Sequence, residues 1–149
     1  MSVGETLAMA PLLERLLADR PDLTVLVTST TPTGAEQVEQ KFAGRVEWCW
    51  APFDTPGAVR RFLAHWHPTV GALVETEIWP NLLTHAAARG VPMILLNARL
   101  SERSASGYGR VAGLTRQTLG HLAGVAAQTE SDANRLRSLG VADKAVVVT

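Results

Sequence analysis

Short apolar runs rich in β-branched residues recur along the chain, separated by longer amphipathic stretches. The runs lack the alternation of polar and apolar positions that marks a strand exposed on one face, so they are typical of a parallel sheet covered on both faces. The pattern predicts six strands, at residues 23–27, 46–50, 70–74, 93–96, 125–127 and 145–148.

Helix start signals stand before the amphipathic stretches. Proline is expected at the first helical position of three helices, at Thr31-Pro32, Thr55-Pro56 and Trp79-Pro80. Thr129 with Asp132 resembles a capping box with Asp in place of Glu, and Gly90 and Gly140 mark two helix ends. The first helix has an apolar stripe and contains Pro11, which we expect to kink or weaken its second turn.

Six strands that alternate with six helices predict an α/β fold with one open, doubly wound, Rossmann-like parallel sheet. The 149 residues, 46% of them hydrophobic, are enough for one domain with an ordinary core. The sequence opens with a helix, whereas this architecture begins with a strand. We therefore expect the sheet to lack its first strand, and both ends of the chain to be cut.

Composition excludes several classes of protein. The 14 basic residues balance 14 acidic ones, and aromatic and basic residues are not interleaved, so nucleic-acid binding is not expected. The longest uncharged runs have 13 residues, whereas a membrane-spanning helix needs about 20. The single cysteine, Cys49, forms no internal disulfide and is expected to be a reduced, packed thiol.

Chemically capable residues follow the predicted strands, at the sheet edge where parallel α/β proteins bind ligands. The candidates are Thr31, Thr33 and Gly34 after the first strand, Glu75 and Glu77 after the third, and Asn97, Arg99, Ser101 and Arg103 after the fourth. Acids, hydroxyls, an amide and arginines therefore converge on one edge, where a purely structural sheet has no need of them.

Two groups of carboxylates are candidates for acid–base chemistry. Glu5 follows Gly4 at the start of the first helix, where the helix dipole favours the carboxylate form, and it is either a general base or an ordinary helix-start charge. Glu75 and Glu77 are two residues apart and point to the same side of an extended chain. They could share a proton, hold a sugar hydroxyl or pair with Arg99.

An anion site is the second chemical candidate. Residues 99–149 hold seven basic residues against four acidic ones, and Arg99 and Arg103 flank Ser101. Guanidinium groups suit phosphate or carboxylate, although a solvated helix face gives the same pattern. The Thr30–Gly34 loop could hold a phosphate or sugar on main-chain N–H groups, or simply cap its helix.

No metal site and no cofactor are predicted. His65 and His67 precede a strand at its amino end, away from the other candidates, and are interpreted as surface or packing residues. Among the tryptophans, Trp48 and Trp50 are predicted to be in the core. Trp79, beside the acidic pair, is the one tryptophan that is a site candidate.

Several motifs together resemble one family, in order and in spacing over essentially the whole chain. They are Ser2-Val3-Gly4-Glu5, Thr30-Thr31-Pro32-Thr33-Gly34, Pro52-Phe53-Asp54, Glu75-Thr76-Glu77-Ile78-Trp79-Pro80-Asn81, the stretch from Asn97 to Ser104, and Gln128-Thr129-Glu130-Ser131-Asp132. The set resembles the N-terminal half of bacterial Kdo (3-deoxy-D-manno-octulosonic acid) transferases of lipopolysaccharide synthesis.

The resemblance implies the N-terminal, acceptor-side domain of an inverting, metal-independent GT-B glycosyltransferase over residues 1–149. It implies a lipid A precursor as acceptor, with Glu5 as the general base and Glu75 or Glu77 as an acceptor-site carboxylate. Arg99 and Arg103 are then candidate contacts to the acceptor's phosphates. The resemblance also implies a peripheral location on the cytoplasmic face of the bacterial inner membrane.

The family's donor-binding C-terminal domain, which holds CMP-Kdo, is absent from this sequence, as are its membrane-seeking segment and first strand. The chain by itself is therefore not expected to transfer sugar. A different reading is a non-catalytic α/β binding module, or a truncated fragment, that keeps only the acceptor cleft. Glu5 and the acidic pair favour the enzyme, because a binding module needs no base.

Overall fold

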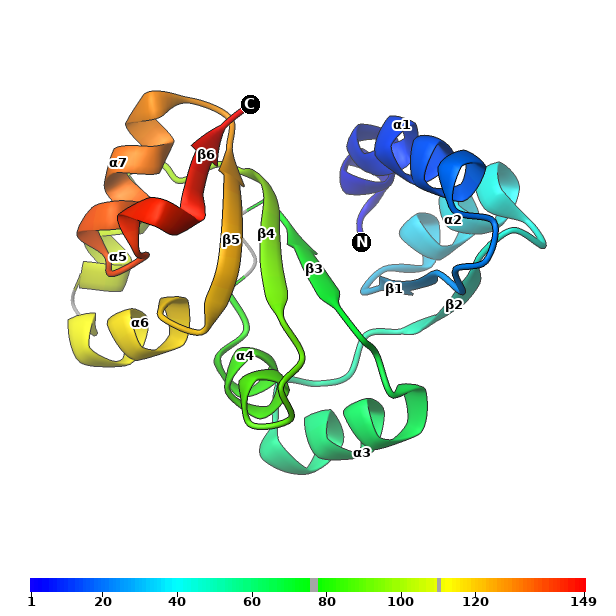
Figure 1. Cartoon of the computed structure of the whole chain (residues 1–149), viewed down its shortest axis with the longest axis horizontal. Helices are drawn as coiled ribbons and strands as arrows, with labels where there is room; N and C mark the ends of the chain where they lie inside the picture. The colour runs from blue at the N-terminus through cyan, green and yellow to red at the C-terminus, as the bar shows by residue number, and fades with distance from the viewer. Residues whose placement is uncertain (76–77, 110) are drawn as a thin grey trace. The chain divides into compact units, whose positions relative to one another are not determined.

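The computed structural model describes residues 1–75, 78–109 and 111–149. They form two compact units, the N-terminal unit (residues 1–51) and the C-terminal unit (residues 52–149), shown in Figure 1. Six strands and seven α-helices lie within the described residues, and all of the strand pairs are parallel. The predicted parallel α/β fold is confirmed.

The N-terminal unit consists of two helices packed on two strands. Its elements are α1 (Val3–Asp19), β1 (Leu26–Ser29), α2 (Pro32–Phe42) and β2 (Glu47–Trp50). Helices α1 and α2 lie side by side over the β1–β2 pair (Figure 1). Helix α1 continues through Pro11, and Val27, Val38 and Phe42 are buried in this unit.

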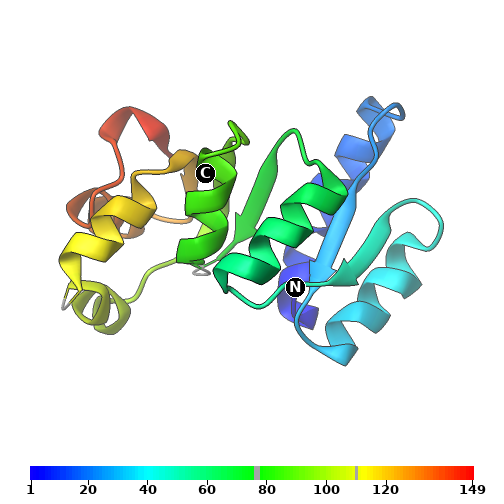
Figure 2. The same cartoon turned by 90° about the horizontal axis from the view of Figure 1, so that it is seen from below.

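The C-terminal unit is built on a four-stranded sheet in the order β3-β4-β5-β6. The strands are β3 (Gly71–Val74), β4 (Met93–Ala98), β5 (Leu122–Ala127) and β6 (Val146–Val148). The helices are α3 (Pro56–Trp66), α4 (Pro80–Ala87), α5 (Glu102–Gly109), α6 (Ala112–Leu119) and α7 (Glu130–Ser138), followed by the 3₁₀ turn η1 (Asp143–Ala145). Helix α3 lies beside α4 (Figure 2), and α7 contacts β5 and β6.

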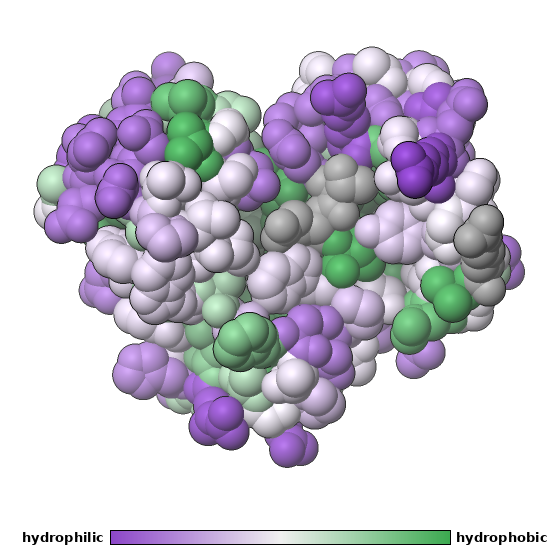
Figure 3. All heavy atoms as spheres, turned by 180° about the vertical axis from the view of Figure 1, so that it is seen from behind, coloured by the Kyte–Doolittle hydropathy of each residue, from purple (hydrophilic) through white to green (hydrophobic). Residues whose placement is uncertain are grey.

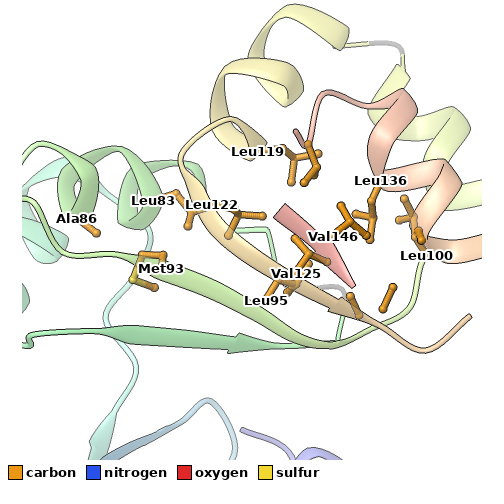
Figure 4. Close-up of a cluster of buried hydrophobic side chains, with 14 of the residues drawn as sticks. Leu83, Ala86, Met93, Leu95, Leu100, Leu119, Leu122, Val125, Leu136 and Val146 are labelled. Carbon is orange, nitrogen blue, oxygen red and sulfur yellow. The ribbon is translucent and has the colours of Figure 1, made fainter. Parts of the chain in front are cut away.

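The core of the C-terminal unit is aliphatic. Leu83 of α4, Leu95 of β4, Leu119 of α6 and Leu136 of α7 are each no more than 2% exposed and belong to one cluster (Figure 4). Truncating such a leucine to alanine costs about 2–5 kcal/mol in well-packed proteins. This cluster fixes the sheet and its helices, and therefore fixes where the strand ends lie.

Proline and glycine mark the helix boundaries largely as predicted. Helices α2, α3 and α4 begin at Pro32, Pro56 and Pro80. The chain reverses after α4 and α7 at Gly90 and Gly140, which have positive φ angles of 70° and 115°. The strands differ from the prediction in their pairing, because they form a two-stranded and a four-stranded sheet rather than one.

The prediction that Trp48 and Trp50 are core residues is wrong. Their exposed fractions are 37% and 53%, and their rings pack edge to face on each other with centroids 5.6 Å apart. The apolar run 46–50 was interpreted as a strand covered on both faces, but among the described residues β2 pairs only with β1. Cys49 between them is half-buried, and burial raises the pKa of its thiol.

Hydrophobic side chains also reach the surface in small groups (Figure 3). Phe53 is 85% exposed, and Leu7 of α1 is 52% exposed. Scattered exposure of this kind is ordinary in folded proteins. Within the described part of the chain, no helix has the length and apolar character needed to cross a membrane.

Candidate functional site

The predicted convergence of polar residues at the strand ends occurs in the C-terminal unit. Val74 of β3 lies opposite Leu96 of β4, and the N–H of Glu75 donates to the Leu96 carbonyl at 2.9 Å. The N–H of Gln128, directly after β5, donates to the Ala98 carbonyl at 3.0 Å. Three neighbouring strands therefore present Glu75, Asn97 and Gln128 along one edge of the sheet.

Two of these residues have a left-handed backbone. The φ angle of Glu75 is 62° and that of Asn97 is 52°, a region in which Asn is tolerated and Glu is strained. Both residues are half-buried, and neither side chain makes a hydrogen bond within the described residues. Backbone strain that carries an uncommitted carboxylate is typical of a functional site.

Helix α4, which follows this edge, is capped from a distance. Trp79 stands at its N-cap position and supplies no side-chain cap. Instead the Asp54 carboxylate accepts the N–H groups of Asn81 and Leu82 at 3.1 and 2.9 Å, and the Asn81 amide donates to the Asp54 carbonyl at 2.7 Å. The start of α4 is thus fastened to the segment before α3.

The arginine-rich segment after β4 lies at the surface. Arg99, Ser101 and Arg103 are exposed, whereas Leu100 between them is 1% exposed. The hydroxyl of Ser101 accepts the N–H of Ser104 at 3.2 Å and so caps the start of α5. Arg99 and Arg103 are therefore presented to solvent next to a helix N-terminus, as an anion site requires.

A buried carboxylate supports this segment from below. Asp132 of α7 is 6% exposed and accepts the N–H of Leu100 at 2.8 Å. Its second oxygen accepts the Thr129 hydroxyl, which in turn caps the Asp132 N–H at 3.1 Å. The Thr129 hydroxyl and the Leu100 N–H, with the positive charges of Arg135 and Arg99, lower the pKa of Asp132.

The capping box predicted at Thr129 and Asp132 is only half present. The Thr129 hydroxyl accepts the N–H of Asp132 as expected of an N-cap. The Asp132 carboxylate does not complete the box, because its oxygens contact Leu100 and the Thr129 hydroxyl. Helix α1, by contrast, has the complete box.

In the N-terminal unit, Glu5 takes part in that complete capping box. The N–H of Ser2 donates to the Glu5 carboxylate at 3.0 Å, and the Ser2 hydroxyl accepts the Glu5 N–H at 3.4 Å. The predicted position of Glu5 in the first turn of the first helix is confirmed. One carboxylate oxygen is engaged by the cap, and the side chain is half-buried.

The loop from Thr31 to Gly34 lies close to the start of α1. The Thr31 hydroxyl accepts the Gly34 N–H at 3.2 Å, so the capping interpretation of this threonine is confirmed. Gly34 is buried against Met1, whose carbonyl oxygen would overlap a Cβ at position 34. The starts of α1 and α2 therefore meet beside the carboxyl end of β1, and Thr33 is exposed.

The predicted site residues thus fall into two groups. Glu5, Thr31, Thr33 and Gly34 belong to the N-terminal unit, and Glu75, Asn97, Arg99, Ser101 and Arg103 belong to the C-terminal unit. Glu77 lies outside the described residues. His65 and His67 are exposed, as predicted, and in the described ranges no three His, Cys, Asp or Glu side chains are grouped as metal ligands.

Comparison with known proteins gives one consistent family. The model of the family described as 3-deoxy-D-manno-octulosonic-acid transferase (kdotransferase) matches residues 1–149. The chain belongs to this Kdo transferase family.

Curated Kdo transferases match over most of this chain. The 3-deoxy-D-manno-octulosonic acid transferase of Bordetella pertussis is 44% identical over 94% of the chain and 33% of the relative. That of Haemophilus influenzae is 35% identical over 99% of the chain and 35% of the relative. A probable mitochondrial one from Arabidopsis thaliana is 39% identical over 70% of the chain. The chain spans about a third of the length of the two bacterial relatives.

A solved structure shares the fold. UDP-GlcNAc 2-epimerase from Neisseria meningitidis, bound to UDP-GlcNAc, superposes with a TM-score of 0.66 over 99% of this chain and 44% of that chain. Its sequence is 17% identical, so the likeness concerns the fold alone. It agrees with the Rossmann-like half of a GT-B architecture predicted from the Kdo transferase motifs.

The motifs of the Kdo transferase resemblance contact each other in pairs within the C-terminal unit. Asp54 of the Pro-Phe-Asp motif binds Asn81 of the Trp-Pro-Asn motif, and Asp132 binds Leu100. Sequence reasoning missed these roles of Asp54 and Asp132. One signal was available for Asp54, because a tryptophan before Pro80 cannot cap a helix and its first N–H groups need an acceptor elsewhere.

Proposed function

We propose that this chain is the acceptor-binding half of an inverting glycosyltransferase that transfers Kdo from CMP-Kdo to a lipid A precursor in lipopolysaccharide biosynthesis. The observation that carries the proposal is the family match over all 149 residues. The polar strand ends of the C-terminal unit support it, because they lie where α/β proteins bind ligands. The chain spans about a third of its bacterial relatives, so the donor CMP-Kdo is assigned to a second domain of the longer protein.

Glu5 is the proposed general base. An inverting transfer needs one base to remove the proton of the acceptor hydroxyl while its oxygen attacks the anomeric carbon and CMP leaves. Glu5 lies in the first turn of α1, where the capping box holds its carboxylate in place. Its hydrogen bond from the Ser2 N–H fixes one oxygen, and the other, which accepts no hydrogen bond from the described residues, is assigned to the acceptor proton.

The remaining site residues are proposed to bind the acceptor. Glu75 and Asn97 supply an acid and an amide for sugar hydroxyls, since both have a strained backbone and neither of these two side chains makes a hydrogen bond among the described residues. Arg99 and Arg103, with Ser101 between them, are assigned to the acceptor's phosphates. Glu77, and separately Thr31, Thr33 and Gly34 of the N-terminal unit, are assigned to the acceptor by the resemblance alone.

The partners follow from the same proposal. The lipid A precursor lies in the bacterial inner membrane, so we propose that the longer protein works as a peripheral protein on the cytoplasmic face of that membrane. No metal is assigned to the reaction by the resemblance. No nucleic acid is assigned as a partner.

Calorimetric titration of this chain with a soluble lipid A precursor and, separately, with CMP tests the proposal. We expect binding of the precursor and none of CMP. Replacing Arg99 and Arg103 together by Ala should weaken precursor binding, because two charge-assisted phosphate contacts are lost. The matched control replaces Arg60 and Arg61 of α3, two exposed arginines with the same total charge, and should leave binding unchanged.

One result would overturn the proposal, and another would remove two of its residues. Binding of CMP without the precursor would mean that the chain is the donor half. Equal affinity in the wild type and in the Arg99→Ala, Arg103→Ala variant would remove both arginines from the site.

A further inference from the structure

Two side chains of α7 form hydrogen bonds with the main-chain N–H and carbonyl groups of Leu100. Asp132 accepts the N–H of Leu100 at 2.8 Å, and Arg135 donates to the Leu100 carbonyl at 3.1 Å. The Arg135 and Asp132 side chains are 3.6 Å apart and form an ion pair. Leu100, which lies in a loop, is thus held at its N–H and at its carbonyl by two oppositely charged side chains that are one helical turn apart on α7.

The arrangement does more than cap helix α7. The Thr129 hydroxyl is the N-cap of that helix, and the Asp132 carboxylate accepts instead from the Leu100 N–H and the Thr129 hydroxyl. Asp132 is only 6% exposed. Burying a carboxylate costs free energy unless the group is hydrogen-bonded and paired with a positive charge. The bonds that offset this cost are those from Thr129 and Leu100 together with the Arg135 pairing, so holding Leu100 is part of what keeps Asp132 in place.

The segment around Leu100 is fastened at further points by the residues after β5. Gln128 donates its N–H to the Ala98 carbonyl at 3.0 Å and its amide to the Asn97 carbonyl at 3.2 Å. Residues 97, 98 and 100 are therefore all bonded to the stretch 128–135. Within the segment 97–101, the exposed side chains are those of Arg99 and Ser101.

The alternation of buried and exposed residues makes this fastening relevant to binding. Leu100 is 1% exposed and points into the core, so fixing its main chain sets the directions of its neighbours Arg99 and Ser101. Fixing the backbone of one residue costs about 1–2 kcal/mol of conformational entropy. In a loop that is already ordered in the folded protein, ligand binding does not have to order the backbone, so this entropy loss does not weaken the affinity.

We propose that Asp132 and Arg135 are positioning residues, which hold Leu100 so that Arg99 and Ser101 of the loop, with Arg103 in the first turn of α5, form one preorganised site for a phosphate-bearing ligand. The ligand class rests on the proposed function. The positioning itself rests on the contacts with Leu100. The two residues touch the ligand only through the loop that they hold.

Inorganic pyrophosphate is the probe for this loop, titrated into the full chain by calorimetry. The variants are Asp132→Ala, Asp132→Asn, Arg135→Ala and Arg135→Lys, with Arg99→Ala, Arg103→Ala to show that binding uses the loop. We expect the two alanine variants at Asp132 and Arg135 to weaken pyrophosphate binding by about tenfold, because one or two residues must then be ordered on binding. Asn and Lys keep one bond to Leu100 and should recover part of the affinity.

Asp54→Ala is the matched control for stability. It also removes a carboxylate that accepts two main-chain N–H groups in the same unit, but those groups belong to α4. We expect it to lower the unfolding midpoint by an amount comparable to Asp132→Ala and to change pyrophosphate affinity less than twofold. Hydrogen exchange at the Leu100 amide should accelerate in Asp132→Ala and not in Asp54→Ala.

The outcomes separate this inference from the proposed function. Unchanged pyrophosphate affinity in Asp132→Ala, or equal losses in Asp132→Ala and Asp54→Ala, overturns the positioning role. Absence of pyrophosphate binding by the wild type overturns it too. Pyrophosphate binding that depends on Asp132, in a chain that does not bind the lipid A precursor, supports the positioning role and removes the proposed acceptor.

Discussion

Asp54 caps helix α4, which begins at Pro80, by accepting the main-chain N–H of Asn81, 27 residues after it. The same carboxylate accepts the N–H of Leu82, and the Asn81 amide returns a hydrogen bond to the Asp54 carbonyl. Two loops that precede different helices are thereby joined, and one of them leads directly from the strained residue Glu75. The start of α4 therefore depends on a residue far from it in sequence.

Replacing Asp54 by Ala should lower the free energy of unfolding by about 1–2 kcal/mol, the usual cost of a lost N-cap. Asp54→Asn should lose less, because an amide oxygen still accepts main-chain N–H groups. Urea unfolding followed by circular dichroism measures both. Thr55→Ala is the matched control, since Thr55 occupies the N-cap position of α3 without making a side-chain cap. A larger loss in Thr55→Ala than in Asp54→Ala would contradict this assignment.

Glu75 adopts a φ angle of 62°, which glycine accepts more easily than any residue with a side chain. Glu75→Gly and Glu75→Ala both remove the carboxylate, so the difference in stability between them measures the strain of the left-handed backbone at position 75. We expect the glycine variant to be more stable by about 1 kcal/mol, since a left-handed conformation costs an L-residue about 1–2 kcal/mol. Thermal unfolding of the two variants makes the measurement.

Glu47 in strand β2 provides the control, because there the glycine variant should be the less stable of the two. It is exposed and extended, so Glu47→Gly should be less stable than Glu47→Ala by about 0.5–1 kcal/mol. If Glu75→Gly is also less stable than Glu75→Ala, the strain at Glu75 is absent. Under the proposed function, Glu75→Gly should weaken binding of the lipid A precursor by this chain while keeping its stability.

The sequence predicts those features that arise from nearby residues. Thr31 and Pro32 begin a helix because a hydroxyl cap and a fixed φ angle act within one turn, and the structure confirms both. The strand positions follow from apolar runs because side chains buried in a sheet leave a local pattern. The order in which candidate residues reach the sheet edge follows from the parallel topology.

Other features depend on distant parts of the chain. Asp54 and Asp132 bond to main-chain groups 27 and 32 residues away, and no local pattern identifies these partners. Trp48 and Trp50 have a strand's composition, but their exposure depends on how many strands and helices cover them. The left-handed conformation of Glu75 has no sequence signal, because glutamate rarely adopts it.

Acid should weaken the contribution of Asp132 to stability. The Thr129 hydroxyl and the Leu100 N–H lower its pKa in the folded chain below that of the unfolded chain, about 3.9. The ionised carboxylate therefore stabilises the fold above that pH, and this contribution is lost as pH falls through the lower, folded-state pKa. Asp132→Asn cannot ionise, so its stability deficit relative to the wild type should be constant at neutral pH and shrink in acid.

Urea unfolding of the two proteins at a series of pH values measures this deficit. Thr129→Val is the informative second variant, because it removes the hydroxyl that lowers the pKa of Asp132 most. In that variant the folded-state pKa lies closer to the unfolded-state value, so the acid-induced loss should be smaller and should be complete at a higher pH than in the wild type. A deficit of Asp132→Asn that stays constant from neutral pH to pH values well below the unfolded-state pKa would rule out the lowered pKa.

Alanine substitutions at Gly90 and Gly140 distinguish the cost of backbone strain from the cost of steric overlap. Both have positive φ angles, 70° and 115°, so an alanine at either position is strained. A Cβ at position 90 meets no atom within 4 Å, whereas at position 140 it would lie 2.6 Å from the Cγ atom and 3.1 Å from the Cα atom of Arg116. We expect Gly90→Ala to cost about 1 kcal/mol, and Gly140→Ala to cost about 1–3 kcal/mol more because Arg116 cannot move its main chain away.

Thermal unfolding of the two variants tests whether the overlap is real. Arg116→Ala in the Gly140→Ala background removes the overlap with the side-chain Cγ atom but leaves the one with the main chain of residue 116, so it should restore only part of the lost stability. Full restoration would assign the whole cost to the side chain. Equal costs at positions 90 and 140 would mean that α6 shifts away from the turn after α7 without resistance, and that these two helices are held together less firmly than their close approach at Gly140 implies.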